Sequence, residues 1–420
     1  MTFRFLHTAD LHLDSPLKGL EKYDGAPVEA LRGATREALE NLVELAVQEN
    51  VSFVLISGDI YDGDWKDYNT GLFFSAQMNR LSKAGIPVYL IRGNHDAASL
   101  ITKELALPEN VHEFPAGKAG TEKIEPLKTA IHGRGFLNRA ETENLVHSYP
   151  EAVEGYLNIG LLHTSLTGRE GHENYAPCSL EDLSRKGYDY WALGHIHLRE
   201  VVREHGPAVV FPGNIQGRHI RESGSKGCTL VTVEDGAVES LEHRPLDVIR
   251  WFDVQADISE LASEDHLLER IGTRITELYN ENGGRFLAVR IHITGTGDLH
   301  ETISVNRDHF VNNVRAKSME AGGDVWIEKV KFHTSASVDR GRFRADTPLG
   351  YVFEYLDSLE ADPVETGEIL EEIKDLYHAL PSALKDKNGA FDPDSPSSFT
   401  SRKERIEDIL LHKLSGKGEG

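Results

Sequence analysis

Residues 88–96 read Val-Tyr-Leu-Ile-Arg-Gly-Asn-His-Asp, an apolar, β-rich segment followed at once by polar side chains. Asn94 offers a neutral carbonyl oxygen to a hard cation, and the adjacent His95 can point away from that cation toward a substrate. Polar side chains at the end of a buried strand lose hydration, and a binding role offsets that cost. The stretch therefore predicts an α/β fold with a functional site at its strand ends.

Four more segments repeat this pattern along the first half of the chain. They are Thr-Ala-Asp-Leu-His at residues 8–12, Ser-Gly-Asp-Ile-Tyr-Asp at 57–62, a histidine at 163 and Gly-His-Ile-His at 194–197. The predicted strands before them cover residues 4–8, 53–57, 158–163 and 190–193. In the stretch quoted first, the predicted strand covers residues 88–92. Alternate positions on an extended segment point to the same side, so Asp10 and His12 can reach one ion.

Each segment alone also has an ordinary structural interpretation. A Gly-Asp pair such as Gly58-Asp59 is commonly just a turn, and a lone His163 is most often a hydrogen-bonded core histidine. His195 and His197 could be solvent-facing residues at a strand end. Five strand ends in order, each delivering Asp, Asn or His, are not expected to arise independently. Together they indicate a metal centre.

Amphipathic helices alternate with these strands. Leu31, Leu39, Leu42 and Val43 fall at helical spacing between the first two strands, and residues 72–81 show the same period after the second. Alternation of strands and helices predicts a layered α/β architecture.

Changes of pattern divide the chain into three predicted parts. Residues 1–246 form the first domain, and residues 247–335 form a small α+β domain whose strands alternate apolar and polar positions. Residues 340–420 form a helical tail, interrupted by a Pro/Ser/Asp-rich linker at 385–401. In the middle part, Arg290, Lys329 and Lys331 occupy outward strand positions. They could contact a phosphate backbone or simply form a solvated face.

Composition limits the classes of function. The chain has 45 Lys and Arg against 68 Asp and Glu, and its net charge of −23 repels a polyanion at long range. Bound divalent ions can reverse this effect locally, so acidity argues against tight stand-alone DNA binding without excluding a nuclease.

The apolar runs are too short for a membrane span, and the N-terminus lacks the features of a signal peptide. With only Cys178 and Cys228, no disulfide framework is expected. We predict a cytoplasmic protein.

The motif set Asp-x-His, Gly-Asp-x-x-Asp, Gly-Asn-His-Asp, His and Gly-His-x-His resembles the calcineurin-like metallophosphoesterase family over the first half of the chain. Residues 7–16, His-Thr-Ala-Asp-Leu-His-Leu-Asp-Ser-Pro, are similar to its DNA repair exonuclease branch, the SbcD-like nucleases and particularly the YhaO type. So are residues 211–228, Phe-Pro-Gly-Asn-Ile-Gln-Gly-Arg-His-Ile-Arg-Glu-Ser-Gly-Ser-Lys-Gly-Cys. The resemblance implies a layered αββα sandwich with a small α+β cap domain and a helical C-terminal tail.

The resemblance also implies a dinuclear metal site. One ion would be held by Asp10, His12, Asp59 and His197, and the other by Asp59, Asn94, His163 and His195. His95 would act in catalysis, with Asp96 orienting it and Asp62 acting from outside the ligand set. Imidazole, carboxylate and amide ligands without a thiolate suit manganese or iron better than calcium. Manganese is the expected metal, and zinc stays open.

The leading hypothesis is a metal-dependent DNA exonuclease and endonuclease subunit acting in DNA repair. The alternative is a small-molecule phosphoesterase for a cyclic nucleotide, a nucleotide or a phosphomonoester, which would share every ligand. A metal-free scaffold would lack one of the ligands, and all of them are present here. The expected partners are DNA and an SMC-like ATPase that the tail would bind, and a homodimer is a further arrangement that we consider.

Overall fold

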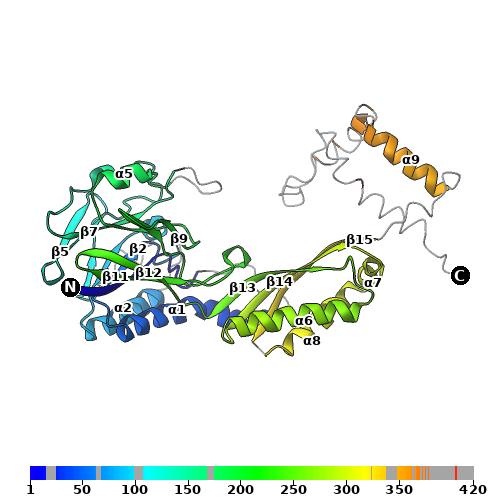
Figure 1. Cartoon of the computed structure of the whole chain (residues 1–420), viewed down its shortest axis with the longest axis horizontal. Coiled ribbons are helices and arrows are strands. Elements are labelled where there is room, and N and C mark those ends of the chain that lie inside the picture. The colour runs from blue at the N-terminus through cyan, green and yellow to red at the C-terminus, as the bar shows by residue number, and fades with distance from the viewer. Residues whose placement is uncertain are drawn as a thin grey trace. The chain divides into compact units, whose positions relative to one another are not determined.

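The computed structural model describes residues 1–15, 25–62, 68–98, 107–167, 175–322, 324–336 and 348–361, with positions 364, 366–368, 371, 374, 377 and 403 (Figure 1). Within these ranges the chain divides into two compact units. One comprises Met1–Val254, Gly272–Ile291 and Val314–Val330, and the other Gln255–Ile271, His292–Asn313 and Lys331–Gly420. The domain boundaries proposed from the sequence stay a prediction.

Six strands form the first sheet of the N-terminal part. Their spatial order is β12 (Ala237–Pro245), β11 (Gly227–Glu234), β1 (Thr2–Thr8), β2 (Phe53–Ser57), β3 (Val88–Ile91) and β4 (Val111–Glu113). Strands β1 to β4 are parallel, whereas β11 runs antiparallel to both β1 and β12. Three strand ends that carry predicted site residues therefore meet at one edge of this sheet.

The second sheet also has six strands. Their order is β5 (Gly120–Ile124), β6 (Thr129–Gly133), β7 (Leu157–His163), β8 (Tyr190–Gly194), β10 (Ala208–Phe211) and β9 (Glu200–Arg203). The central strands β6, β7, β8 and β10 are parallel, and antiparallel β5 and β9 form the edges. The β7 and β8 ends bring two more predicted site segments together.

The two sheets pack face to face because their strands are apolar on both sides. Phe5 and Phe53 stack with ring centroids 4.8 Å apart, in a core shared with Ile159 and Tyr190 of the second sheet. On β1 and β2 the alternate side chains Leu6 and Val54 face the other way. They pack against the first two helices.

Helices cover the outer faces. α1 (Val28–Gln48) and α2 (Tyr68–Lys83) bury Leu39, Leu42 and Phe74 in the cluster that contains Leu6. Over the second sheet, α5 (Leu180–Arg185) and the 3-10 helix η3 (Leu145–Ser148) pack with Trp191. The shorter elements are α3 (Asn94–Ala98) and the 3-10 helices η2 (Glu125–Leu127) and η4 (Ile220–Glu222). The predicted αββα sandwich is confirmed.

A separate three-stranded sheet follows, in the order β13 (Ile249–Asp257), β14 (Phe286–Thr296) and β15 (Val325–Ser335). Its helices are α6 (Glu264–Glu281), α7 (Leu299–Val305) and α8 (Arg307–Met319), and α9 (Pro348–Ala361) comes next in the chain. The predicted linker at 385–401 and the apolar stripe at 406–414 lie outside the described residues. No helix in the described ranges combines the length and apolar character needed to cross a bilayer.

Candidate metal centre

The site is built from turns directly after five parallel strands. Asp10, His12, Asp59 and His195 all have positive φ, at 53°, 43°, 55° and 101°. Non-glycine residues avoid this region, and such strain persists only where the surroundings enforce it. Backbone bonds do so here, because the amide of Asp10 donates to the Gly58 carbonyl at 3.0 Å and that of His12 to the Asp59 carbonyl at 3.1 Å. The two turns are locked to each other.

One donor cluster joins the first and last motifs. Ligand atoms of Asp10, His12 and His197 all lie within 4.8 Å of one another. The Nε2 atoms of His12 and His197 are 3.1 Å apart, although these residues are 185 positions apart in the chain. The carboxylate of Asp10 accepts the backbone N–H of His195 at 3.0 Å, which ties the β1 end to the β8 end. The cluster thus spans both sheets.

A second cluster surrounds Asp59. Ligand atoms of Asp59, His163 and His195 also lie within 4.8 Å of one another. Oδ2 of Asp59 lies 3.4 Å from Nε2 of His163 and 3.8 Å from Nε2 of His12, so it sits between the two clusters. Oδ1 of Asn94 is 2.9 Å from Nε2 of His163. Every residue that the sequence nominated as a ligand therefore belongs to one of these two clusters or, in the case of Asn94, lies beside the second.

The chemistry of these donors fits divalent cations. Nδ1 of His163 lies 2.9 Å from the Ser57 carbonyl, which can only accept, so Nδ1 carries the proton and Nε2 of the neutral ring presents a lone pair. That lone pair faces oxygens of Asn94 and Asp59, which are also electron-rich. In the metal-free protein a proton can take the place of the cation on Nε2: burial opposes charge on the ring, yet the Asp59 carboxylate raises the pKa of His163 to about 9. The pocket thus favours a positive charge at this point, as a metal site does.

His95 stands beside these donors and shares the Asp62 carboxylate with His12, whose Nδ1 lies 3.7 Å from Oδ1 of that carboxylate. Nδ1 of His95 lies 2.9 Å from Oδ1 of Asp62. Burial alone would lower the pKa of His95, but the bond to Asp62 and the charge of Asp59 raise it above the usual value. Asp96 has a different set of contacts, because its carboxylate accepts the backbone N–H groups of Ile60, Tyr61 and Gly93 at 2.9–3.0 Å. Asp62 is thus in contact with the His95 ring, and Asp96 fixes the surrounding turns.

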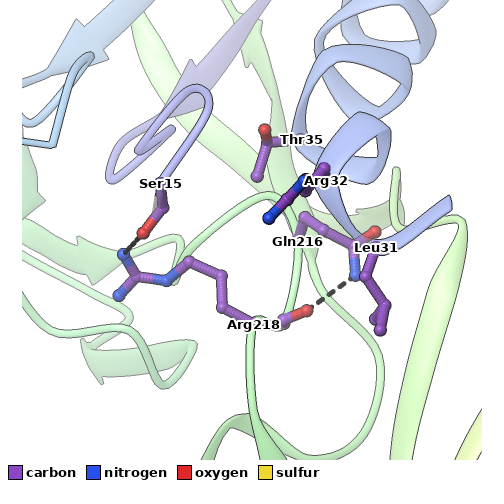
Figure 2. Close-up of a pocket in the computed structure, with 7 residues that line it drawn as sticks. Ser15, Leu31, Arg32, Thr35, Gln216 and Arg218 are labelled. Carbon is purple, nitrogen blue, oxygen red and sulfur yellow. Dashed lines mark hydrogen bonds between the residues drawn. The ribbon is translucent and has the colours of Figure 1, made fainter. Parts of the chain in front are cut away.

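Two residues near the centre had not been singled out from the sequence. Glu222 contacts Nδ1 of His197 at 2.7 Å, and Arg218 pairs with Glu222 at 3.1 Å. Both belong to the 211–228 stretch, but an exposed loop explains Glu and Arg equally well, and no periodicity marks them. Figure 2 shows Arg218 reaching toward Ser15, with an Nη1 to Oγ distance of 3.4 Å, across a small pocket. The pocket is also lined by Leu31, Arg32, Thr35, Gln216 and Gly217.

The three basic residues nominated for substrate contact lie on β14 and β15 and are not members of the donor clusters. Arg290 makes a two-pronged ion pair with Glu328, with Nε to Oε2 at 2.7 Å and Nη2 to Oε1 at 2.5 Å. Its charge is therefore largely compensated. Lys329 is exposed and Lys331 is half-buried.

Fold and donor set together define a metal-dependent phosphoesterase. The model for the calcineurin-like phosphoesterase family matches residues 3–199, and the model for the middle domain of metallophosphoesterase YhaO matches residues 251–335. The chain belongs to the calcineurin-like metallophosphoesterase family, whose members use a dinuclear metal site, and it is accordingly a hydrolase of phosphoesters.

Individual relatives are similar over much of the chain. The uncharacterized metallophosphoesterase YhaO of Bacillus subtilis is 33% identical over 86% of this chain and 89% of its own length. The DNA double-strand break repair protein Mre11 of Sulfurisphaera tokodaii is 25% identical, over 62% of this chain and 67% of its own. The crystal structure of a Thermus thermophilus protein matches with a TM-score of 0.35 and 16% identity, covering 59% of this chain and all of that one.

Proposed function

We propose that this protein is the nuclease subunit of a DNA repair complex and hydrolyses DNA phosphodiester bonds as an exonuclease and endonuclease. The observation that carries the proposal is the paired donor cluster centred on Asp59, with His95 beside it. The similarity to proteins named for DNA double-strand break repair supports DNA as the substrate class.

The ligand roles are proposed from the geometry. Asp10, His12 and His197 would hold one divalent ion, Asn94, His163 and His195 the other, and Asp59 would serve both. Such a pair of ions supplies an activated water and neutralises charge on the phosphate. Manganese is the proposed metal because the donors are hard oxygens and imidazoles without a thiolate.

His95 is proposed to protonate the leaving oxygen. Oδ1 of Asp62 lies 2.9 Å from Nδ1 and the neighbouring carboxylates raise the pKa of His95, so the charged ring is favoured and its Nε2 carries a proton that it can donate. About 29% of the His95 side chain is exposed, whereas the neighbouring His12 is buried at 1%. His95 can therefore meet a substrate while its orientation is fixed from behind.

A small-molecule phosphoesterase is the second candidate, and the net charge of −23 favours it because a polyanion is repelled at long range. The deciding assay offers the manganese-loaded protein four substrates in parallel: linear duplex DNA, single-stranded DNA, bis(p-nitrophenyl) phosphate and a phosphomonoester. Nuclease function requires cleavage of DNA. Turnover of the phosphomonoester with intact DNA would refute it.

The proposed partner is an SMC-like ATPase, which would deliver DNA to an acidic nuclease that binds it poorly. The tail from residue 340 onward is the proposed docking segment, and most of it lies outside the described residues. To test this, residues after Lys385 are deleted and co-purification with an SMC-like ATPase from the same cells is measured alongside bis-ester hydrolysis. We expect hydrolysis to persist and association to be lost. Unchanged association would rule out the tail as the docking element.

A further inference from the structure

The loop after β10, residues 212–222, carries side chains that no motif assigned to the metal centre. His197 ends the last motif, and its Nδ1 is 2.7 Å from Oε1 of Glu222. A carboxylate only accepts hydrogen bonds, so this contact requires a proton on Nδ1. Nε2 then presents its lone pair toward His12 and Asp10, as ligation of a shared ion requires.

A competing contact does not change this assignment. Nη2 of Arg218 lies 3.3 Å from the same Nδ1, and as a donor it would prefer a lone pair there. Each contact has one charged partner, so distance decides between them, and the Glu222 contact is 0.6 Å shorter, at 2.7 against 3.3 Å. An unprotonated Nδ1 would also face the carboxylate repulsively. The Nδ1–H tautomer is thus the stable one.

Glu222 is itself held on its other oxygen. Oε2 accepts the backbone N–H of Arg218 at 2.8 Å and the side-chain amide of Asn214 at 3.0 Å. Only 6% of the Glu222 side chain is exposed. With both oxygens occupied by donors, the carboxylate has little freedom to turn away from His197.

The loop is anchored to strand β13 on its far side. The buried side chain of Gln216 donates to the carbonyl of Ile249 at 2.6 Å and accepts the N–H of Val248 at 2.9 Å. The Trp251 indole donates to the Gly217 carbonyl at 2.9 Å. A Cβ on Gly217 would come within 2.6 Å of the Glu222 carbonyl oxygen, so the loop closes tightly on itself. The position of Glu222 is consequently set by a rigid frame.

We infer that Glu222 is a positioning residue, which fixes the tautomer and ring orientation of His197 so that the site can bind the ion shared with Asp10 and His12. The inference rests on the proposed dinuclear site. Partners behind a ligating histidine typically change metal affinity by about 10- to 100-fold.

The experiment titrates the metal-stripped full-length protein with manganese chloride by calorimetry. We compare the wild type with Glu222→Gln, with Glu222→Asp and with the control Glu181→Gln, which also removes one carboxylate but one that pairs with exposed Arg185. Glu222→Gln should weaken one of two binding events by about 10- to 100-fold and leave the other unchanged. Glu222→Asp keeps the carboxylate charge but moves it away from Nδ1 of His197. It should therefore reduce the affinity of the same binding event by less than Glu222→Gln does. The control should match the wild type.

A second readout needs no metal and no activity. Nitrogen-15 NMR of the metal-free protein, with His197 assigned by its loss in His197→Asn, reports which ring nitrogen is protonated. The Nδ1–H form should dominate in the wild type and the control, and lose population in Glu222→Gln. If Glu222→Gln does not fold, judged by circular dichroism, the same two measurements on Glu222→Asp decide.

The outcomes separate the two ideas. Unchanged manganese affinity and an unchanged tautomer in the Glu222 variants would overturn the positioning role while leaving the metal site standing. A wild type that binds no manganese would refute the proposed dinuclear function, and the tautomer measurement alone would then decide the role of Glu222.

Discussion

Oδ1 of Asp62 lies 2.9 Å from Nδ1 of His95, while Oδ2 of the same carboxylate accepts the hydroxyl of Ser15 at 2.5 Å. The carboxylate is therefore fixed from two sides, and it restrains the partly exposed imidazole. His95 belongs to the motif after β3 and Asp62 to the motif after β2, so the pair forms only when the sheet brings the two turns together.

Replacing His95 tests the separation of catalysis from metal binding. We expect His95→Gln to reduce bis-ester turnover by about 10²- to 10⁴-fold, because the residue is assigned to proton transfer. Manganese content should stay near that of the wild type. Asp59→Asn should lose both metal and activity, because its carboxylate lies between the two clusters. Metal analysis of the purified variants decides, and equal metal loss in both would show that this partition of roles is wrong.

Weakening the support of His95 should lower kcat without removing metal. Asp62→Asn keeps the shape of the side chain but loses the charge that stabilises the imidazolium, so we expect kcat to fall about 10- to 100-fold. Ser15→Ala is the matched variant, since it removes one donor to the same carboxylate and leaves its charge; its effect should be smaller. A kcat for Asp62→Asn equal to that of the wild type would speak against proton donation by His95.

Gly93 should not tolerate a methyl group. A Cβ at this position would overlap the Asp59 carboxylate and approach the Asp59 amide nitrogen at 2.7 Å, so Gly93→Ala must displace the central donor. We predict strongly reduced manganese binding, measured by calorimetry. Gly117→Ala is the control, because a Cβ there meets nothing within 4 Å. Retention of full manganese affinity in Gly93→Ala would contradict the placement of Asp59 at the centre.

Metal removal should destabilise the protein. An ion that binds only the folded state stabilises it by about 2.7 kcal/mol at a hundredfold excess over Kd. Scanning calorimetry in manganese and in EDTA should show a lower Tm in EDTA. His95→Gln should keep this difference and Asp59→Asn should lose it. The same Tm in both buffers for the wild type would argue against a bound ion.

The basic residues of β14 and β15 should separate into two kinds. The double variant Lys329→Gln/Lys331→Gln should weaken DNA cleavage, and the more so at low salt. Hydrolysis of the bis-ester and the folding stability should stay unchanged. Arg290→Gln should instead lower stability, by about 3 kcal/mol, because it leaves Glu328 buried at 5% exposure without its partner. Denaturant melts and a salt titration of DNA cleavage measure the two effects. Unchanged DNA cleavage in the double lysine variant would show that Lys329 and Lys331 do not contact the DNA.

The sequence was sufficient for the layered fold and for the list of candidate donors. Apolar strands buried on both faces produce continuous hydrophobic runs, and the polar residues after Ser57, Ile91 and His163 interrupt those runs at visible points. The antiparallel β11–β12 hairpin beside β1 was not predicted, because the register of Phe5 against Val231 depends on a pairing between distant parts of the chain.

What the tertiary structure alone decided is which groups stand next to one another. The family resemblance assigned Asp96 to orient His95 and placed Asp62 outside the ligand set, without a contact to His95. The turn instead directs the Asp96 carboxylate into backbone N–H groups and places Asp62 against the ring. Glu222 gives no periodic signal, and it reaches His197 only because the loop after β10 folds back and is anchored on β13. Residue types and strand periods are local properties that a sequence displays, whereas contacts between loops depend on chain closure over long distances, which no local pattern encodes.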